Sequence, residues 1–295
     1  MPVGPLSNPM MQPSISTSSW DSQEILDACE RSLLGREAEL HLDQSPQGLD
    51  ALDEVDVHPL LAAGLQAVGW GVVREQPLPG GVSKSPGLPK HAQRERCDLV
   101  LLPSPRHVLL DWVRESRERT KWQGSLFESV PTPPPLPDRA LCVDARDAFW
   151  LEVKVVAQHA FIDGVPRPNG AWGAQLVASL TQDLAKLAAQ TSAPHDDAVH
   201  NGKPLESRAL ATSGGSIIEP KPGLSHAGLL LVIFAETPDV IAHDLPIALH
   251  RALDKGATFR SPIHATRRDM AVPPGFAISD RIGNAWCQCV LVPAN

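Results

Sequence analysis

The segment Phe149 to Gln158 constrains the fold more than any other part of this chain. It is rich in β-branched and aromatic residues, which is typical of a β-strand. Because side chains alternate across a strand, Glu152 and Lys154 would share one face. Burying charged groups costs free energy unless they are paired or bind a metal ion. A core strand that carries an acid and a base side by side is therefore a candidate functional segment.

A second segment offers a partner for this acid and base. The short apolar run from Cys97 to Leu102 stops before Pro103 and carries one acid, Asp98, near its start. We expect this run to form another strand of the same sheet. On adjacent strands, Asp98 and Glu152 would lie close enough to share one ion.

The pattern of Asp98 followed by Glu152-Val153-Lys154 resembles the PD-(D/E)XK nuclease superfamily, which has the restriction-endonuclease-like fold. In that family an acid on one strand and Glu-x-Lys on the next bind magnesium and activate water. The proline that nominally precedes the first acid is often absent, and Cys97 stands there in this chain.

The resemblance implies catalytic roles for Asp98, Glu152 and Lys154. It implies that Asp98, Glu152 and the backbone carbonyl of Val153 bind Mg²⁺ or Mn²⁺, which take oxygen ligands. Lys154 would orient the attacking water or stabilise the charge that develops on the phosphate.

The expected elements follow the order αβββαβ, which is the order of the superfamily's core. They are a helix at 59–68, strands at 70–76, 97–102 and 149–157, a helix at 171–190 and a buried strand at 227–235. The second helix carries one apolar face that we expect to pack on the sheet, formed by Trp172, Leu176, Leu180, Leu184 and Leu187. The fold class is therefore α/β, with a restriction-endonuclease-like core and a mixed central sheet flanked by helices.

Three regions are expected along the chain. Residues 1–19 form a disordered tail rich in Pro, Ser and Met, and residues 20–56 form an acidic helical segment. Residues 57–295 form the nuclease-like domain, with loop insertions at about 105–137 and 191–226. A helix from His107 to Lys121 is expected within the first insertion.

Three further side chains are candidates for supporting the site. Glu75 would end the first strand and face the same cleft, and Gln158 would share the face of Glu152 and Lys154. Gln175 lies on a polar stripe of the helix at 171–190, together with Ser179, Gln182 and Lys186. The alternative for Glu75, Gln175 and Lys186 is that their side chains are exposed to solvent and have no part in the site. For the triad, the alternative is a buried ion pair between Glu152 and Lys154 with no catalytic role.

The distribution of charge is compatible with a nucleic-acid partner, although the net charge is −8. Eleven acidic residues and two arginines fall within residues 1–56, so the rest of the chain is nearly neutral. Phosphate binding needs a local positive patch rather than a basic total. Candidate patches, which are alternatively ordinary solvated surface, are Arg260, Arg267 and Arg268, and Arg114, Arg117, Arg119 and Lys121.

The cysteines predict an intracellular, cytoplasmic protein. There are five, an odd number, and none is in a CxxC pair. Cys287 and Cys289 alternate in a strand-like run and are expected to act as small apolar residues. No apolar run approaches the roughly 20 residues that span a bilayer, so no membrane partner is expected. The first residues also lack the pattern of a secretory signal.

These observations predict a magnesium-dependent phosphodiesterase that cleaves nucleic acid, with DNA the expected substrate rather than RNA. One alternative is a catalytically inactive relative that keeps the fold for nucleic-acid binding or scaffolding. Another is an interaction protein of unrelated α/β fold, which would place Asp98 and Glu152 on strands that are not adjacent. Endonuclease or exonuclease action, and the formation of a homodimer, are left open.

Overall fold

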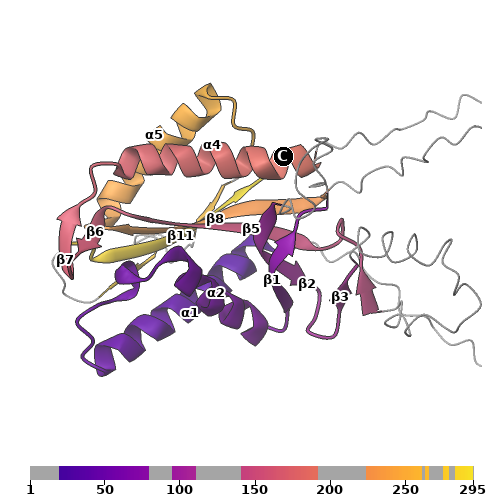
Figure 1. Ribbon diagram of the computed structural model, residues 1–295, viewed down its shortest axis with the longest axis horizontal. Coiled ribbons are helices and arrows are strands. Elements are labelled where there is room, and N and C mark those ends of the chain that lie inside the picture. The colour runs from indigo at the N-terminus through magenta and orange to yellow at the C-terminus, as the bar shows by residue number, and fades with distance from the viewer. Residues whose placement is uncertain are drawn as a thin grey trace, which may run out of the picture.

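The computed structural model describes residues 20–79, 95–110, 141–191, 224–260, 263–265, 275–278 and 283–294. They form three layers, in which a central sheet is covered by α1 and α2 on one side and by α4 and α5 on the other (Figure 1). The tail expected at residues 1–19 and most of both expected insertions lie outside the described residues. The helices are α1 Ser22–Leu42, α2 Glu54–Ala67, α4 Trp172–Thr191 and α5 Pro238–Asp254, with a 3₁₀ turn at Leu49–Ala51.

The sheet is mixed, and its strands lie in the order β1-β2-β5-β8-β11-β10, with β9 beside β11. β1, β2 and β5 are antiparallel neighbours, β5 and β8 are parallel, and β11 is antiparallel to β8. Joining the parallel pair requires a crossover, and α4 lies within it. The strands are β1 Gly71–Pro77, β2 Arg96–Leu102, β5 Phe149–Ala157, β8 His226–Ala235, β9 His264–Ala265, β10 Phe276–Ala277 and β11 Trp286–Pro293.

The apolar face of α4 packs on the sheet, as its helical spacing predicts. Leu180, Leu184 and Leu187 are fully buried, and they share one core with the sheet residues Trp150, Leu229 and Ile233. At the start of the helix, the indole N–H of Trp172 donates a hydrogen bond to Asp244 of α5 at 2.8 Å. This prediction is confirmed.

A second core fills the opposite side of the sheet. Ile25 and Leu33 of α1 and Leu61 of α2 are fully buried there against the sheet. Cys287 and Cys289 lie in the same core as small buried residues. The helix at the start of the described chain thus belongs to the same packed body as the sheet.

The start of α2 corrects a sequence-based expectation. We expected a helix from Pro59, but α2 begins at Glu54 with Asp53 as its N-cap residue, and Pro59 lies inside it. Glu54 and Asp56 occupy the first turn, where the helix dipole favours negative charge. Residues four apart lie on one face of a helix, so the earlier start places Glu54 and His58 together. The boundary expected between residues 56 and 57 also falls inside this helix.

Two smaller elements also differ from expectation. The chain after β5 forms a hairpin of β6 His159–Ile162 and β7 Val165–Pro168, which is not among the expected elements. Asp163 and Gly164 form its turn, with positive φ angles of 54° and 75°. In the first insertion, β3 Val108–Leu109 pairs in parallel with β4 Cys142–Val143, where we expected the start of a helix. The rest of that expected helix, from 111 to 121, lies outside the described residues.

Candidate functional site

The site forms where two neighbouring strands of the sheet separate. In the described chain, β2 pairs with β5 from Leu101–Phe149 to Leu99–Leu151 and no further. β5 continues to Ala157 and stays paired with β8 along its full length. The backbone N–H groups of Val153 and Val155 therefore face a gap where a strand partner would have been. A buried amide without an acceptor costs free energy, so the chain must supply other acceptors there.

Two carboxylates supply these acceptors. The N–H of Val153 donates to Oδ2 of Asp98 at 2.8 Å, and the N–H of Val155 donates to Oε2 of Glu54 at 3.3 Å. Asp98 comes from β2 and Glu54 from the first turn of α2. The separation of the strands thus brings two acids from different elements against the segment that carries Glu152 and Lys154.

Glu152 is the most deeply buried acid of this site, with only 3% of its surface exposed. Its Oε1 accepts a hydrogen bond from Nζ of Lys186 in α4 at 2.6 Å. Its Oε2 is buried and has no hydrogen-bond partner among the residues that the structure describes. Burial, followed by the charge of Asp98, raises the pKa of Glu152 to about 7. The site therefore holds a carboxylate that is only half satisfied.

Lys154 pairs with Glu54 instead of Glu152. Its Nζ donates to Oε1 of Glu54 at 2.8 Å, and 27% of its side chain is exposed. Partial burial alone would lower the pKa of Lys154, but the hydrogen bond and charge of Glu54 outweigh it and raise the pKa. The alternative of a simple Glu152–Lys154 ion pair is therefore wrong, because each side chain has a different partner.

Two more acids of this site, Asp98 and Asp183, have raised pKa values. Burial raises the pKa of Asp98, and the amide of Val153 and the charge of His58 oppose that rise. Burial likewise raises the pKa of Asp183, which lies one turn before Lys186 in α4 and is in the field of both lysines. Acids with pKa values raised by burial and mutual repulsion are typical of sites that bind cations or transfer protons.

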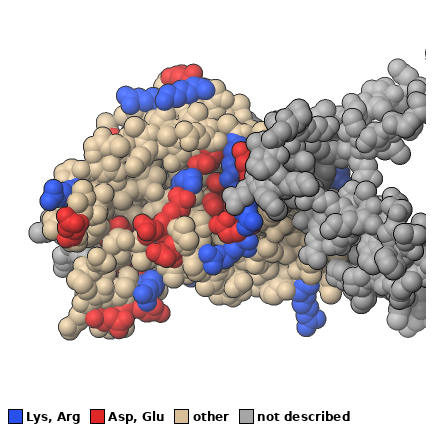
Figure 2. Space-filling view, in the orientation of Figure 1, with Lys and Arg blue, Asp and Glu red and all other residues tan. Residues whose placement is uncertain are grey.

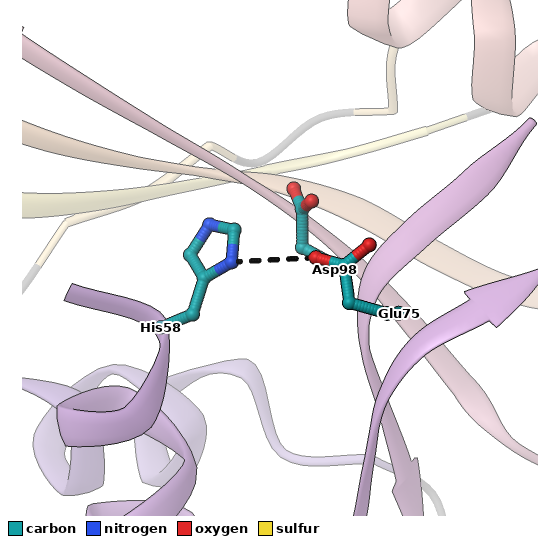
Figure 3. Close-up of side chains that lie close together, drawn as sticks. All are labelled: His58, Glu75 and Asp98. Atoms are coloured by element: carbon teal, nitrogen blue, oxygen red, sulfur yellow. Dashed lines mark ion pairs between the residues drawn. The ribbon is translucent and has the colours of Figure 1, made fainter. Parts of the chain in front are cut away.

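Two further side chains, His58 of α2 and Glu75 of β1, lie close to Asp98. His58 of α2, Glu75 of β1 and Asp98 of β2 converge in Figure 3, with ligand atoms that all lie within 4.8 Å of one another. His58 Nδ1 lies 3.9 Å from Oε1 of Glu75. Asp98 thus faces β5 through its hydrogen bond to Val153 and is also close to His58 and Glu75.

Two of the expected supporting residues are engaged elsewhere. The side chain of Gln158 accepts a hydrogen bond from the N–H of Glu236, just beyond the end of β8. The side chain of Gln175 accepts one from Asn169, in the loop before α4. Both contacts fasten the end of β5 and the start of α4, so the geometry gives these two residues a structural role.

Sequence analysis missed Glu54, His58 and Asp183 as members of the site, and placed Lys186 only on a polar stripe. Asp53 followed by Glu54 and Asp56 is a helix-start signal. It would have predicted that α2 begins at Glu54. Asp183 and Lys186 lie three residues apart and therefore share a helix face. Nothing in the sequence alone indicates that this face looks toward Glu152.

Acidic and basic side chains gather side by side over the middle of the face shown in Figure 2.

No family model, curated protein or solved structure matches this chain. Among the described residues, no helix is long and apolar enough to cross a membrane.

Proposed function

We propose that this protein is a metal-dependent nuclease that hydrolyses phosphodiester bonds, with DNA as its substrate. One observation carries the proposal: the carboxylate of Asp98 is bonded to the amide of Val153, the residue between Glu152 and Lys154. Asp98 lies 54 positions before Glu152 in the sequence, yet its carboxylate contacts the segment Glu152-Val153-Lys154 on the adjacent strand.

The arrangement of the elements supports a restriction-endonuclease-like core. α2, β1, β2, β5, α4 and β8 follow one another in the order αβββαβ, with smaller elements inserted between them. The first three strands form an antiparallel meander, and the strand after α4 returns parallel to β5. Asp98 and Glu152 lie on the adjacent strands β2 and β5, which favours this proposal over an interaction protein that has these acids on non-adjacent strands.

The residues at the site fit a divalent cation. The acids Glu54, Asp98, Glu152 and Asp183 face two lysines, which leaves a formal charge of −2 when all are ionised. The buried Oε2 of Glu152 has no partner in the described chain, and a cation would satisfy it. Asp98, Glu152 and the carbonyl of Val153, which leaves the strand on the same side as its amide, would hold Mg²⁺ or Mn²⁺.

A bound cation of this kind supplies positive charge for a phosphate and makes a water molecule more acidic. Lys154 would add a fixed positive charge beside it. Because the pKa of Lys154 is raised, this side chain is protonated at neutral pH and serves as a donor rather than as a base. The pairing with Glu54 holds its ammonium group in place, and its partial exposure leaves it within reach of a substrate. Lys154 would therefore orient the water or stabilise the phosphate charge.

The proposal is tested by incubating purified protein with single- and double-stranded DNA and RNA in Mg²⁺, Mn²⁺ or EDTA. We expect cleavage of DNA that needs the metal and that falls at least about 100-fold in Lys154→Met. Lys255→Met removes an exposed lysine near the end of α5 and is the matched control. Binding of DNA with no cleavage under any metal would favour the alternative of an inactive nucleic-acid-binding relative.

A further inference from the structure

His58 is buried without the hydrogen bonds that a buried histidine needs. Only 2% of its surface is exposed, and neither ring nitrogen has a hydrogen-bond partner within the described part of the chain. A neutral imidazole has one donor and one acceptor nitrogen, and leaving such a buried group unsatisfied is destabilising. The 3.9 Å between His58 Nδ1 and Glu75 Oε1 is too long for a hydrogen bond. Within the described residues both ring nitrogens are therefore left for a partner that a bound ion could supply.

Two acids, Glu75 and Asp98, lie close to this imidazole. Glu75 and Asp98 fall between the register pairs Arg74–Leu99 and Gln76–Cys97 of β1 and β2. Like charges directly opposite each other on antiparallel strands are destabilising. A cation between them would remove this repulsion and would also give the imidazole a partner.

We propose that His58, Glu75 and Asp98 form a second cation site, which binds a divalent first-row transition-metal ion such as Mn²⁺ in preference to Mg²⁺. An imidazole nitrogen suits transition metals, while all-oxygen sites suit Mg²⁺ and Ca²⁺. The three ligand atoms lie within 4.8 Å of one another. Two ligands at about 2.1 Å from one ion can be at most about 4.2 Å apart, so movements of less than about 1 Å close the site.

This site adjoins the one proposed for phosphodiester hydrolysis but has two ligands of its own, His58 and Glu75. The two share Asp98, whose carboxylate has two oxygens, but His58 and Glu75 do not take part in the contacts of Glu152 and Lys154. The preference of this site for Mn²⁺ over Mg²⁺ can be measured by metal binding in the absence of nucleic acid. Failure to find this preference would leave the cleavage result untouched, and a protein without nuclease activity could still bind the ion here.

The direct test is pulsed electron paramagnetic resonance of the full-length protein loaded with Mn²⁺. A histidine ligand gives the Mn²⁺ signal a hyperfine coupling to nitrogen, which oxygen ligands cannot produce. We expect this nitrogen coupling in the wild type and its loss in His58→Gln. The matched control is His250→Gln, which changes an exposed histidine of α5 and should keep the coupling.

A second variant guards against misfolding of His58→Gln, whose side chain is buried. The Glu75 side chain is 49% exposed, so Glu75→Gln should fold normally. We expect it to lower the affinity for Mn²⁺ at least tenfold and to change the affinity for Mg²⁺ less than threefold. A wild-type spectrum without nitrogen coupling would overturn the proposal. Coupling that persists in folded His58→Gln, or Mn²⁺ affinity unchanged in Glu75→Gln, would do the same.

Discussion

The carboxylate of Asp98 accepts a hydrogen bond from the backbone N–H of Val153 at 2.8 Å, across the gap where β2 and β5 separate. A strand carbonyl would ordinarily occupy this position in a sheet. Here the carboxylate of Asp98 does so, beside Glu152. Burial raises the pKa of both acids, while the hydrogen bond from Val153 opposes the rise at Asp98. The bond to Val153 thus places two acids where a cation could join them.

Replacing Asp98 by Asn should separate this structural role from the chemical one. The Asn carbonyl can still accept the hydrogen bond from Val153, but the negative charge beside Glu152 is lost. We expect cleavage in Mg²⁺ to fall about 100-fold, because a ligand of the cation is weakened. The melting temperature in EDTA should stay the same or rise, because repulsion with Glu152 is relieved. Unchanged cleavage in Asp98→Asn would contradict the assignment.

Lys186→Met should destabilise the protein in the absence of metal. This change removes the ammonium group 2.6 Å from Oε1 of Glu152, whose side chain is 4% exposed, and leaves the acid without a positive partner. Breaking a buried pair in this way costs roughly 3–5 kcal/mol. Thermal melts in EDTA should show the loss, and saturating Mg²⁺ should recover part of it by binding Glu152. If Mg²⁺ recovers nothing while the wild type is stabilised, Glu152 does not bind the ion.

Lys154→Met should have the opposite profile. The Lys154–Glu54 pair is partly exposed, at 27% and 32%, so losing it should cost no more than about 1 kcal/mol of stability. Cleavage should nevertheless fall by at least about 100-fold, because the charge beside the phosphate is lost. Melting curves and cleavage rates of Lys154→Met and Lys186→Met, measured side by side, check this contrast. A large loss of stability in Lys154→Met with cleavage retained would reverse the two roles.

The stability of the metal-free protein should fall as pH rises from about 5 to 8. The pKa of Glu152 is raised from 4.5 to about 7, so the folded state keeps a proton that the unfolded state has already released. The stability contributed by this group is complete below pH 4.5 and is lost as pH rises through 7, a change on the order of 3 kcal/mol. Asp98 and Asp183, with raised pKa values, act in the same direction, while Lys186 keeps its charge throughout.

Urea denaturation at several pH values in EDTA measures this dependence. Glu152→Gln should remove the part of the slope that belongs to Glu152, and Mg²⁺ should flatten the slope in the wild type by favouring the ionised acid. Wild-type stability that rises with pH over this range would show that Glu152 is not held in its protonated form.

Much of the fold could be predicted because its signals are local and periodic. The spacing from Trp172 to Leu187 gives the buried face of α4, and the continuous apolar run of β8 gives a strand buried on both faces. The start of α2 was missed because proline is most common in the first turn of a helix, which suggested a start at Pro59. In the structure, Pro59 lies in the second turn. The hairpin after β5 was missed because its two strands have only four residues each and the second contains two prolines, which are uncommon in strands.

The site was predictable in part, for a different reason. Asp98, Glu152 and Lys154 form a pattern that can be found in the sequence, but the partners of each charge depend on how distant elements pack. Lys186 reaches Glu152 from 34 residues away, and Glu54 reaches Lys154 from 100 residues away. No periodicity connects such positions. The separation of β2 from β5, which gives Asp98 and Glu54 their roles, is likewise a tertiary feature.

Whether Asp98 and Glu152 share a bound cation can be measured directly from the anomalous scattering of Mn²⁺, in crystals of the protein grown at saturating Mn²⁺. We predict a peak within about 2.3 Å of a carboxylate oxygen of Asp98 and of Oε2 of Glu152. The same crystals soaked in EDTA should lose the peak. A well-ordered map with no peak between these two acids, and with Glu152 still held by Lys186 alone, would contradict the account.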